Sequence, residues 1–151
     1  MGKTLIVYHS VSGNTEKIAL GLSRLLEADL VKINDKEKSG SLLIKTPSIL
    51  LQWSGILRKD QKINIDAYER IFIGSPCWGY RVTPQVKHFV ENHDFRGKEV
   101  LLFMTHGGDC GNSSDRFKAL IKDGIYLGML DYQISVEDKV VMKDLKRLGV
   151  K

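Results

Sequence analysis

The sequence of 151 residues has few cysteines and no long apolar run, and each absence excludes a class of protein. Its two cysteines, Cys77 and Cys110, are too few for a disulfide framework, and no pair of Cys or His residues has the spacing of a zinc site. No stretch reaches the roughly 20 apolar residues that a membrane-spanning helix needs. The segment before His9 also lacks the charged and apolar regions of a signal peptide. We therefore expect a cytoplasmic protein without membrane insertion and without a structural metal.

The net positive charge of the sequence is moderate and is not concentrated in one segment. The chain has 23 basic and 18 acidic residues, a net charge of +5 and an isoelectric point near 9.2, but its basic residues form no long run. Nucleic acid is therefore not an expected partner. The motif Gly-x-x-x-x-Gly-Lys-[Ser/Thr] is missing, so NTP hydrolysis would lack its phosphate-binding lysine. The length and the 42% of apolar residues suit a single domain over residues 1–151.

What the sequence does contain is an alternation of short apolar runs with helical patterns. The apolar runs predict five strands: Thr4 to Tyr8, Asp29 to Ile33, Arg70 to Ser75, Lys98 to Thr105 and Asp131 to Val136. Apolar residues at helical spacing predict five helices: from Thr15 through Leu26, Pro47 to Leu57, Pro84 to about Asn92, Phe117 to Ile125 and Val141 to Leu148. This order is typical of an α/β fold with a doubly wound five-stranded parallel sheet, which is a three-layer α/β/α sandwich. The unbroken run Val100 to Met104 indicates an interior strand.

The loop between the first strand and the first helix has the composition of an anion site. Its residues are Ser10, Val11, Ser12, Gly13, Asn14 and Thr15. Backbone N–H groups at a helix start, together with hydroxyl groups, can donate hydrogen bonds to a phosphate. Because the loop contains no Lys or Arg, these bonds and the helix dipole would hold the phosphate, which suits a retained cofactor. The same residue types also suit an ordinary turn and N-cap.

Two further loops follow strands that end at the same edge of the predicted sheet. The loop from Pro76 to Thr83 carries two aromatic residues, and the loop from His106 to Ser113 is rich in glycine. In an open parallel sheet, ligands bind at the carboxyl ends of the strands, where the strand order reverses. The three loops therefore predict one binding site.

On these three loops the chain resembles the flavodoxin-like family of FMN proteins, particularly its short members, over nearly its whole length. The matching segments are Ser10 to Thr15, Gly74 to Tyr80 and Thr105 to Gly108. The resemblance implies the strand order 2-1-3-4-5, FMN as cofactor, and electron transfer between a reductase that donates and an enzyme that accepts. An FMN-dependent NAD(P)H reductase of quinones or similar acceptors is the alternative.

The resemblance also implies which residues bind each part of FMN. The phosphate would be held by Ser10, Val11, Ser12, Gly13, Asn14 and Thr15. One face of the flavin ring would lie on Pro76, Cys77, Trp78, Gly79 and Tyr80. The other edge of the ring would meet Thr105, His106, Gly107, Gly108 and Cys110. Trp78, with Tyr80 second, is the aromatic residue expected to stack on the ring. The Gly79 peptide would turn to meet flavin N5, and backbone N–H groups of the third loop would bond the pyrimidine edge.

The net positive charge departs from the acidic character of typical flavodoxins. Arg81 and His106 lie in the two predicted flavin loops, and a positive charge near the ring would stabilise the reduced, anionic flavin. We therefore expect a less reducing flavin than is usual for the family.

The two cysteines are compatible with other functions. Cys110 and Arg116 have the spacing of a cysteine phosphatase loop, in which a thiolate at a helix start attacks a phosphate. Cys77 and Cys110 lie in facing loops, so a disulfide is conceivable, although two ordinary thiols are expected in a reducing cytosol. A signalling receiver domain is excluded, because His9, Ser10 and Ser75 stand where its acidic residues are needed.

Overall fold

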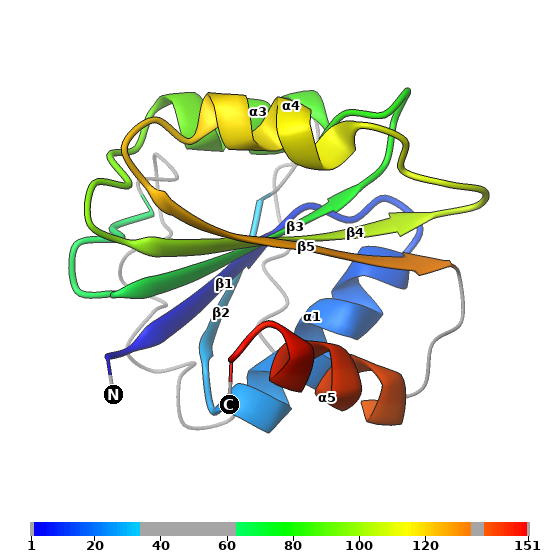
Figure 1. Cartoon of the computed structure of the whole chain (residues 1–151), viewed down its shortest axis with the longest axis horizontal. Coiled ribbons are helices and arrows are strands. Elements are labelled where there is room, and N and C mark those ends of the chain that lie inside the picture. Colours follow the sequence, from blue (N-terminus) through cyan, green and yellow to red (C-terminus); the bar gives the residue numbers. More distant parts are fainter. Residues whose placement is uncertain (1, 34–62, 134–137, 151) are drawn as a thin grey trace.

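The computed structural model describes residues 2–33, 63–133 and 138–150, in which five strands alternate with four helices (Figure 1). The strands are β1 (Thr4–Tyr8), β2 (Asp29–Lys32), β3 (Arg70–Pro76), β4 (Glu99–His106) and β5 (Ile125–Gln133). The helices are α1 (Asn14–Leu26), α3 (Pro84–Glu91), α4 (Ser113–Leu120) and α5 (Asp138–Arg147).

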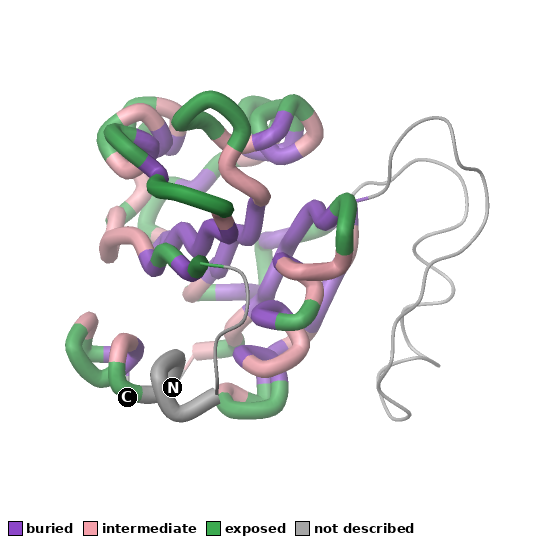
Figure 2. Tube along the Cα trace, turned by 90° about the vertical axis from the view of Figure 1, so that its right-hand side faces the viewer, coloured by how far each residue is buried: buried purple, intermediate pink, exposed green. Residues whose placement is uncertain are grey.

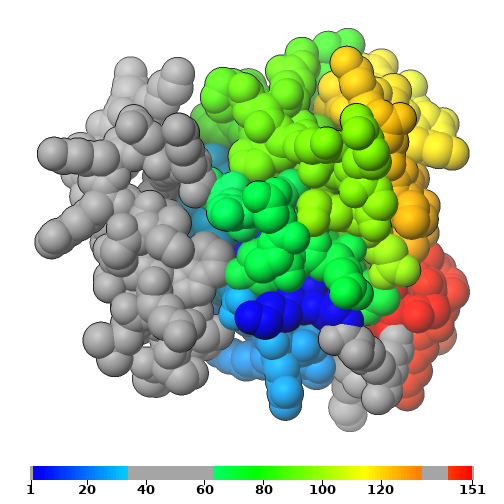
Figure 3. Space-filling model, turned by 90° about the vertical axis from the view of Figure 1, so that its left-hand side faces the viewer, coloured from blue at the N-terminus to red at the C-terminus, as the bar shows by residue number. Residues whose placement is uncertain are grey.

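All neighbouring strands pair in parallel, in the order β2-β1-β3-β4-β5, so the predicted fold class and strand order are confirmed. From β1 the chain first moves to one side, to β2, and then crosses to the other side, to β3. The carboxyl ends of β1 and β3 therefore lie at the point where the strand order reverses, which is where α/β sheets bind ligands. Figure 2 shows the molecule from this edge, and Figure 3 shows the opposite edge, where the strands begin.

Helices cover both faces of the sheet, and each face has its own core (Figure 1). On one face, Ile18 and Leu22 of α1 and Leu145 of α5 pack with alternate residues of the strands. On the other face, α3 and α4 contribute Phe89 and Phe117 in the same way. The predicted interior strand lies within β4, where Val100 to Met104 are completely buried because helices cover both of their faces.

The fifth strand begins earlier than the sequence predicts. Ile125 is the first residue of β5 and is 54% exposed, so its assignment to the preceding helix is wrong. The pairing of β5 with β4 shifts register after Tyr126, and Gly128, two residues later, has a φ of 130°. This glycine interrupts the apolar run in the sequence, so the run does not indicate a strand. As a result, Asp131 lies beside Met104 near the carboxyl edge of the sheet, and not at the start of a strand.

Further predictions differ from the structure or fall on residues that it does not describe. Apolar spacing places Leu25 on the buried face of the first predicted helix, but Leu25 is 38% exposed in α1, because the stripe that faces the sheet includes Thr15, Ala19 and Ser23. The predicted helix Pro47 to Leu57, the polar stretch Lys36 to Ser41 before it, which indicates a loop, and the side chain of Val141 lie outside the described residues. None of the helices in the described part of the chain is long and apolar enough to cross a membrane.

A buried tyrosine makes the stability of this fold sensitive to alkaline pH. The Tyr68 hydroxyl donates a 2.8 Å hydrogen bond to Asp29 Oδ2. The pKa of Tyr68 is raised well above its ordinary value of 10.0, mainly by burial and secondly by this carboxylate. The folded protein thus holds the phenol proton more tightly than the unfolded chain does. The stabilisation is complete below about pH 10 and is lost as the pH rises further.

We therefore expect the free energy of unfolding to fall as the pH rises above about 10, and to fall less steeply in Tyr68→Phe. Urea titrations of both proteins between pH 8 and about 11 would measure the two slopes. Equal slopes would show that the Tyr68 proton is not coupled to folding.

Candidate functional site

The three predicted loops meet at the carboxyl edge of the sheet and enclose a cavity of about 140 Å³. Every residue that lines it was predicted from the sequence: Ser12, Asn14, Pro76, Cys77, Trp78, Thr105, His106 and Gly107. Sites for small molecules usually measure roughly 300–1,000 Å³. The cavity therefore encloses one part of a ligand, and the remainder would lie against the exposed loop residues around it.

The first loop leads into α1 without a side-chain cap. Gly13 occupies the N-cap position with a φ of 92°, a left-handed conformation that glycine adopts without strain. The loop is held from within, because Gly13 N–H donates to Ser10 Oγ at 3.1 Å and Asn14 Nδ2 donates to Ser12 Oγ at 3.0 Å. Glu16, the acidic residue of the first helical turn, forms a 2.9 Å ion pair with Lys32. This partner offsets the negative charge that would otherwise repel an anion at the helix start.

Thr15, the last residue of the predicted phosphate loop, contacts the end of β4. It is buried, and its hydroxyl oxygen lies 2.7 Å from that of Thr105, so the two hydroxyl groups share a hydrogen bond. Of the two, Thr105 lines the cavity. Thr15 thus ties the first loop to the end of β4.

The second loop makes a tight reversal that presents Trp78. Trp78 N–H donates to the Arg81 carbonyl at 2.9 Å, and Arg81 N–H returns a 3.2 Å bond to the Trp78 carbonyl. Gly79 and Tyr80 between them have φ values of 56° and 60°, which is the pattern of a type I′ turn. Left-handed backbone at a residue such as Tyr80 costs about 1–2 kcal/mol, and such strain is typical of functional loops.

The two aromatic residues of this loop have different surroundings. Trp78 is 48% exposed, lines the cavity and meets the buried His9 ring edge-on, with centroids 6.4 Å apart and an interplanar angle of 86°. Tyr80 lies against the third loop, where a Cβ on Gly111 would overlap its ring. Of the two, only Trp78 lines the cavity.

The base of the second loop is fixed to its neighbours. Thr83 N–H, at the start of α3, donates to Ser75 Oγ at 2.9 Å, which draws the two ends of the loop together. Cys77 N–H donates to the Thr105 carbonyl at 2.9 Å, which ties the loop to β4. These bonds hold Trp78 at a defined position over the cavity.

The third loop closes on itself next to the cavity. Asp109 Oδ1 accepts the Gly111 N–H at 2.7 Å, and the Cys110 carbonyl accepts both the N–H and the hydroxyl of Ser113. Gly107 and Gly108 are exposed, and a Cβ on either would point into open space. A flat ring could therefore approach the backbone of this loop closely.

The remaining predicted residues belong to the same three loops but are not among those that line the cavity. Ser10 and Cys110 are buried, and Val11 is 62% exposed. Gly13 is held by its hydrogen bond to Ser10, and Gly79 by the two hydrogen bonds between Trp78 and Arg81.

Comparison with known proteins identifies the family. A sequence model of the flavodoxin family matches residues 53–138, more than half of the 151 residues. The chain belongs to the flavodoxin family. The resemblance inferred from the three loops is thereby confirmed. A comparison with curated protein sequences gives no match.

Solved structures agree with this flavodoxin assignment. A candidate flavoprotein from Bacteroides eggerthii is 26% identical with a TM-score of 0.76, and the match covers 100% of both chains. A flavoprotein from Lactobacillus acidophilus, solved in complex with FMN, is 25% identical with a TM-score of 0.62 over 95% of this chain and 98% of its own. Oxidised flavodoxin 1 from Bacillus cereus, at 18% identity and a TM-score of 0.63, covers 99% of this chain and 96% of its own and shares the fold.

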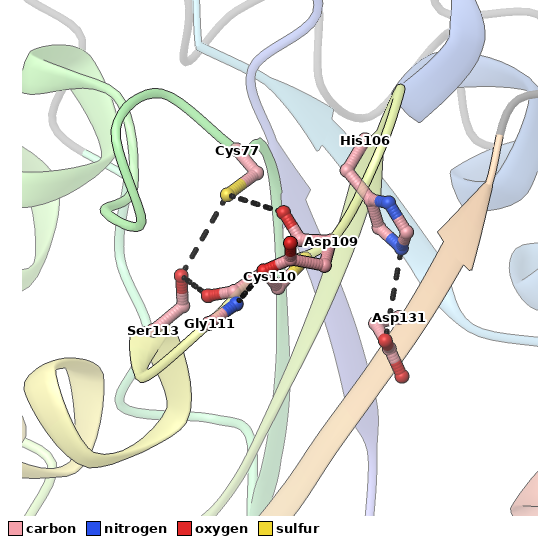
Figure 4. A network of polar contacts seen from close by, with 7 residues as sticks. All are labelled: Cys77, His106, Asp109, Cys110, Gly111, Ser113 and Asp131. Atoms are coloured by element: carbon pink, nitrogen blue, oxygen red, sulfur yellow. Dashed lines mark hydrogen bonds and ion pairs between the residues drawn. The ribbon is translucent and has the colours of Figure 1, made fainter.

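In this flavodoxin, the two cysteines are free thiols in neighbouring loops. Cys77 Sγ lies 3.7 Å from Ser113 Oγ and 3.9 Å from the Asp109 carbonyl oxygen, and Cys110 is buried (Figure 4). The pKa of Cys110 is raised to about 12, mainly by burial of the thiol and secondly by the nearby Cys77. Cys110 is therefore a protonated thiol at neutral pH, which argues against the phosphatase hypothesis, because that reaction needs a thiolate.

Three contributors to this site were not predicted. His9 supports Trp78, Ser113 contacts Cys77, and Asp131 Oδ2 lies 3.6 Å from His106 Nε2. The position of His9 directly after the first strand could have indicated it, because that position lies at the carboxyl edge. Asp131 gave no such indication, since the sequence placed it at the opposite end of its strand.

Proposed function

We propose that this protein is an FMN-binding electron carrier that receives electrons from a reductase and passes them to an acceptor enzyme. The cavity to which all three loops contribute, at the point where the strand order reverses, supports this function. FMN is the cofactor, and when bound it supplies the exchange of one or two electrons. The protein contributes binding, shielding from water and electrostatic control of the flavin.

The residues of the site fit FMN. Around the helix start, Ser12 and Asn14 offer hydroxyl and amide donors beside an uncapped N-terminus, which suits a phosphate. Around the cavity mouth, the half-exposed Trp78 and the open backbone at Gly107 suit a flat ring. We propose that the ring lies between them and that backbone N–H groups of the third loop bond its pyrimidine edge.

The rim of the site suits contact with a partner protein. Val11, Trp78 and Tyr80 are among the few large apolar side chains that are exposed in the described residues, and all three belong to loops at this edge. Apolar side chains gathered around a redox centre allow a partner to approach closely and exclude water between the two groups. The acceptor and the donor would both dock here.

The absorbance spectrum of the purified protein, recorded before and after addition of FMN and removal of the excess, tests this function. Flavin bands with quenched fluorescence are expected. The reduced protein should then pass electrons to cytochrome c but oxidise NADH and NADPH only slowly. Rapid oxidation of NAD(P)H with a quinone would support the alternative, a reductase, which the basic net charge slightly favours. A protein that takes up no FMN would overturn both.

The hydrogen bond between Thr15 and Thr105 should contribute to FMN binding, because it joins the phosphate loop to the cavity wall. We expect Thr15→Ala to weaken FMN binding by ~1–3 kcal/mol, as for a lost buried hydrogen bond. Thr105→Ala should cause a similar loss, and the double variant little more, because the two hydroxyl groups act as one pair. Fluorescence titration with FMN measures all three. Additive losses would show that each hydroxyl group acts separately.

The charge of Arg81 should raise the flavin potential. Arg81 is exposed in the second loop, whereas His106 Nε2 lies 3.6 Å from the Asp131 carboxylate. We expect Arg81→Gln to lower the midpoint potential of a one-electron flavin couple by roughly 20–40 mV, the equivalent of ~0.5–1 kcal/mol for an exposed charge. A spectroelectrochemical titration compares the two proteins, and an unchanged potential would place Arg81 away from the flavin.

A further inference from the structure

Three side chains with metal-binding groups converge beside the third loop. His106 ends β4, Cys110 lies in the loop that follows, and Asp131 belongs to the neighbouring strand β5 (Figure 4). One ligand atom of each, an imidazole nitrogen, a sulfur and a carboxylate oxygen, lies within 4.8 Å of the other two. Sequence spacing could not reveal this cluster, because the register of β5 against β4 brings Asp131 to it.

The contacts of His106 in this cluster are incomplete. Its side chain is only 10% exposed, and Nδ1 is buried with no hydrogen-bond partner among the described residues. Nε2 faces Asp131 Oδ2 at 3.6 Å, which is too long for a hydrogen bond. A buried imidazole nitrogen without a hydrogen-bond partner, such as Nδ1, is uncommon, and Nε2 makes no hydrogen bond to Asp131 that would compete with an ion.

The separation of His106 and Asp131 is that of two ligands of one tetrahedral ion. Zinc bonds of ~2.0–2.3 Å place tetrahedral ligands about 3.3–3.8 Å apart. The distance of 3.6 Å between Nε2 and Oδ2 falls in this range. A movement of roughly 1 Å by the third loop would bring Cys110 within the same range.

The chemistry of the three groups selects among metal ions. Ca²⁺ and Mg²⁺ prefer sites built wholly from oxygen, whereas a thiolate with an imidazole suits Zn²⁺. When the ion binds, the Cys110 thiol loses its proton to solvent, and the thiolate and the Asp131 carboxylate balance the charge of the dication. Asp131 is 54% exposed, so an ion can reach the cluster from solvent.

We propose that His106, Cys110 and Asp131 form a zinc site with three protein ligands and one open position. Cys77 lies next to Cys110 but is outside the set of three, because its thiol contacts the Ser113 hydroxyl and the Asp109 carbonyl. The proposal goes beyond electron transfer and does not rest on FMN binding.

Calorimetric titration of the purified protein with ZnCl₂ tests the site, and one ion per chain is expected. Titration with Co²⁺ gives a second readout, since tetrahedral Co²⁺ with a thiolate ligand absorbs at longer wavelengths than oxidised flavin. We expect Asp131→Asn and Cys110→Ser each to weaken Zn²⁺ binding at least tenfold, and Cys110→Ser to abolish these long-wavelength cobalt bands.

Two control variants match these substitutions. Cys77→Ser removes the neighbouring thiol, and Asp115→Asn removes an exposed carboxylate in the first turn of α4, and neither should change Zn²⁺ binding more than twofold. Because Asp131 is exposed, Asp131→Asn should remain folded even if a serine at the buried position 110 does not. The flavin spectrum is recorded for every variant, so loss of FMN binding and loss of zinc binding are seen separately.

Absence of Zn²⁺ uptake by a protein with a normal flavin spectrum would overturn the proposal. Equal losses in Cys77→Ser and Cys110→Ser, or full Zn²⁺ binding by Asp131→Asn, would overturn this ligand set as well. Zinc binding by a protein that takes up no FMN would support the site and contradict only the proposed electron carrier.

Discussion

Gly74→Ala is expected to destabilise the fold by about 3 kcal/mol, the upper end of the usual cost of overpacking. Gly74 lies in β3 between Tyr8 of β1 and Phe103 of β4. A Cβ on Gly74 would overlap the ring of Phe103, which is completely buried and has no space into which to move. Urea unfolding followed by circular dichroism would measure the loss.

A compensating substitution tests the cause of this loss. Phe103→Leu alone should cost about 1–2 kcal/mol by leaving a small cavity, but in the Gly74→Ala background it should restore stability, because the ring that clashes is gone. Gly108→Ala is the matched control, since Gly108 is exposed with open space around it and should change stability by less than ~0.5 kcal/mol. Additive losses in the double variant would show that the Phe103 ring is not the obstacle.

Trp78→Ala should weaken FMN binding by ~2 kcal/mol, roughly thirtyfold in Kd, as for the loss of one stacked aromatic ring. Trp78 is half-exposed at the cavity, so most of the free energy from burying its ring is expected only when the flavin ring covers it. Trp78→Phe should keep most of the affinity, because it retains a flat apolar face. Fluorescence titration with FMN measures the affinity of each variant.

Tyr80→Ala separates stacking from packing. The Tyr80 ring lies against Gly111, so its removal should affect FMN binding less than the removal of Trp78. The folded stability of Trp78→Ala should be close to that of the wild type, which thermal unfolding without FMN would check. Greater loss of affinity in Tyr80→Ala than in Trp78→Ala would reverse the assignment of the stacking residue.

Strands buried on both faces were predictable because a continuous apolar run admits few other structures. Thr4 to Tyr8 is β1 with the predicted bounds, and Val100 to Met104 lies inside β4 as expected. The edge strand β5 was not predictable to the same degree. Part of it is exposed, and its bulge and Gly128 interrupt the apolar pattern on which strand prediction depends.

The sequence by itself determined the fold class and the residues that surround the cavity. Both follow from local information, which is the alternation of apolar runs with helical patterns and the composition of the loops at the strand ends. Only the tertiary structure decided that Thr15 pairs with Thr105, that Tyr80 rests on Gly111 and that Asp131 faces His106. These contacts join residues far apart in the chain, and strand register and loop conformation, which depend on packing across the whole sheet, bring them together.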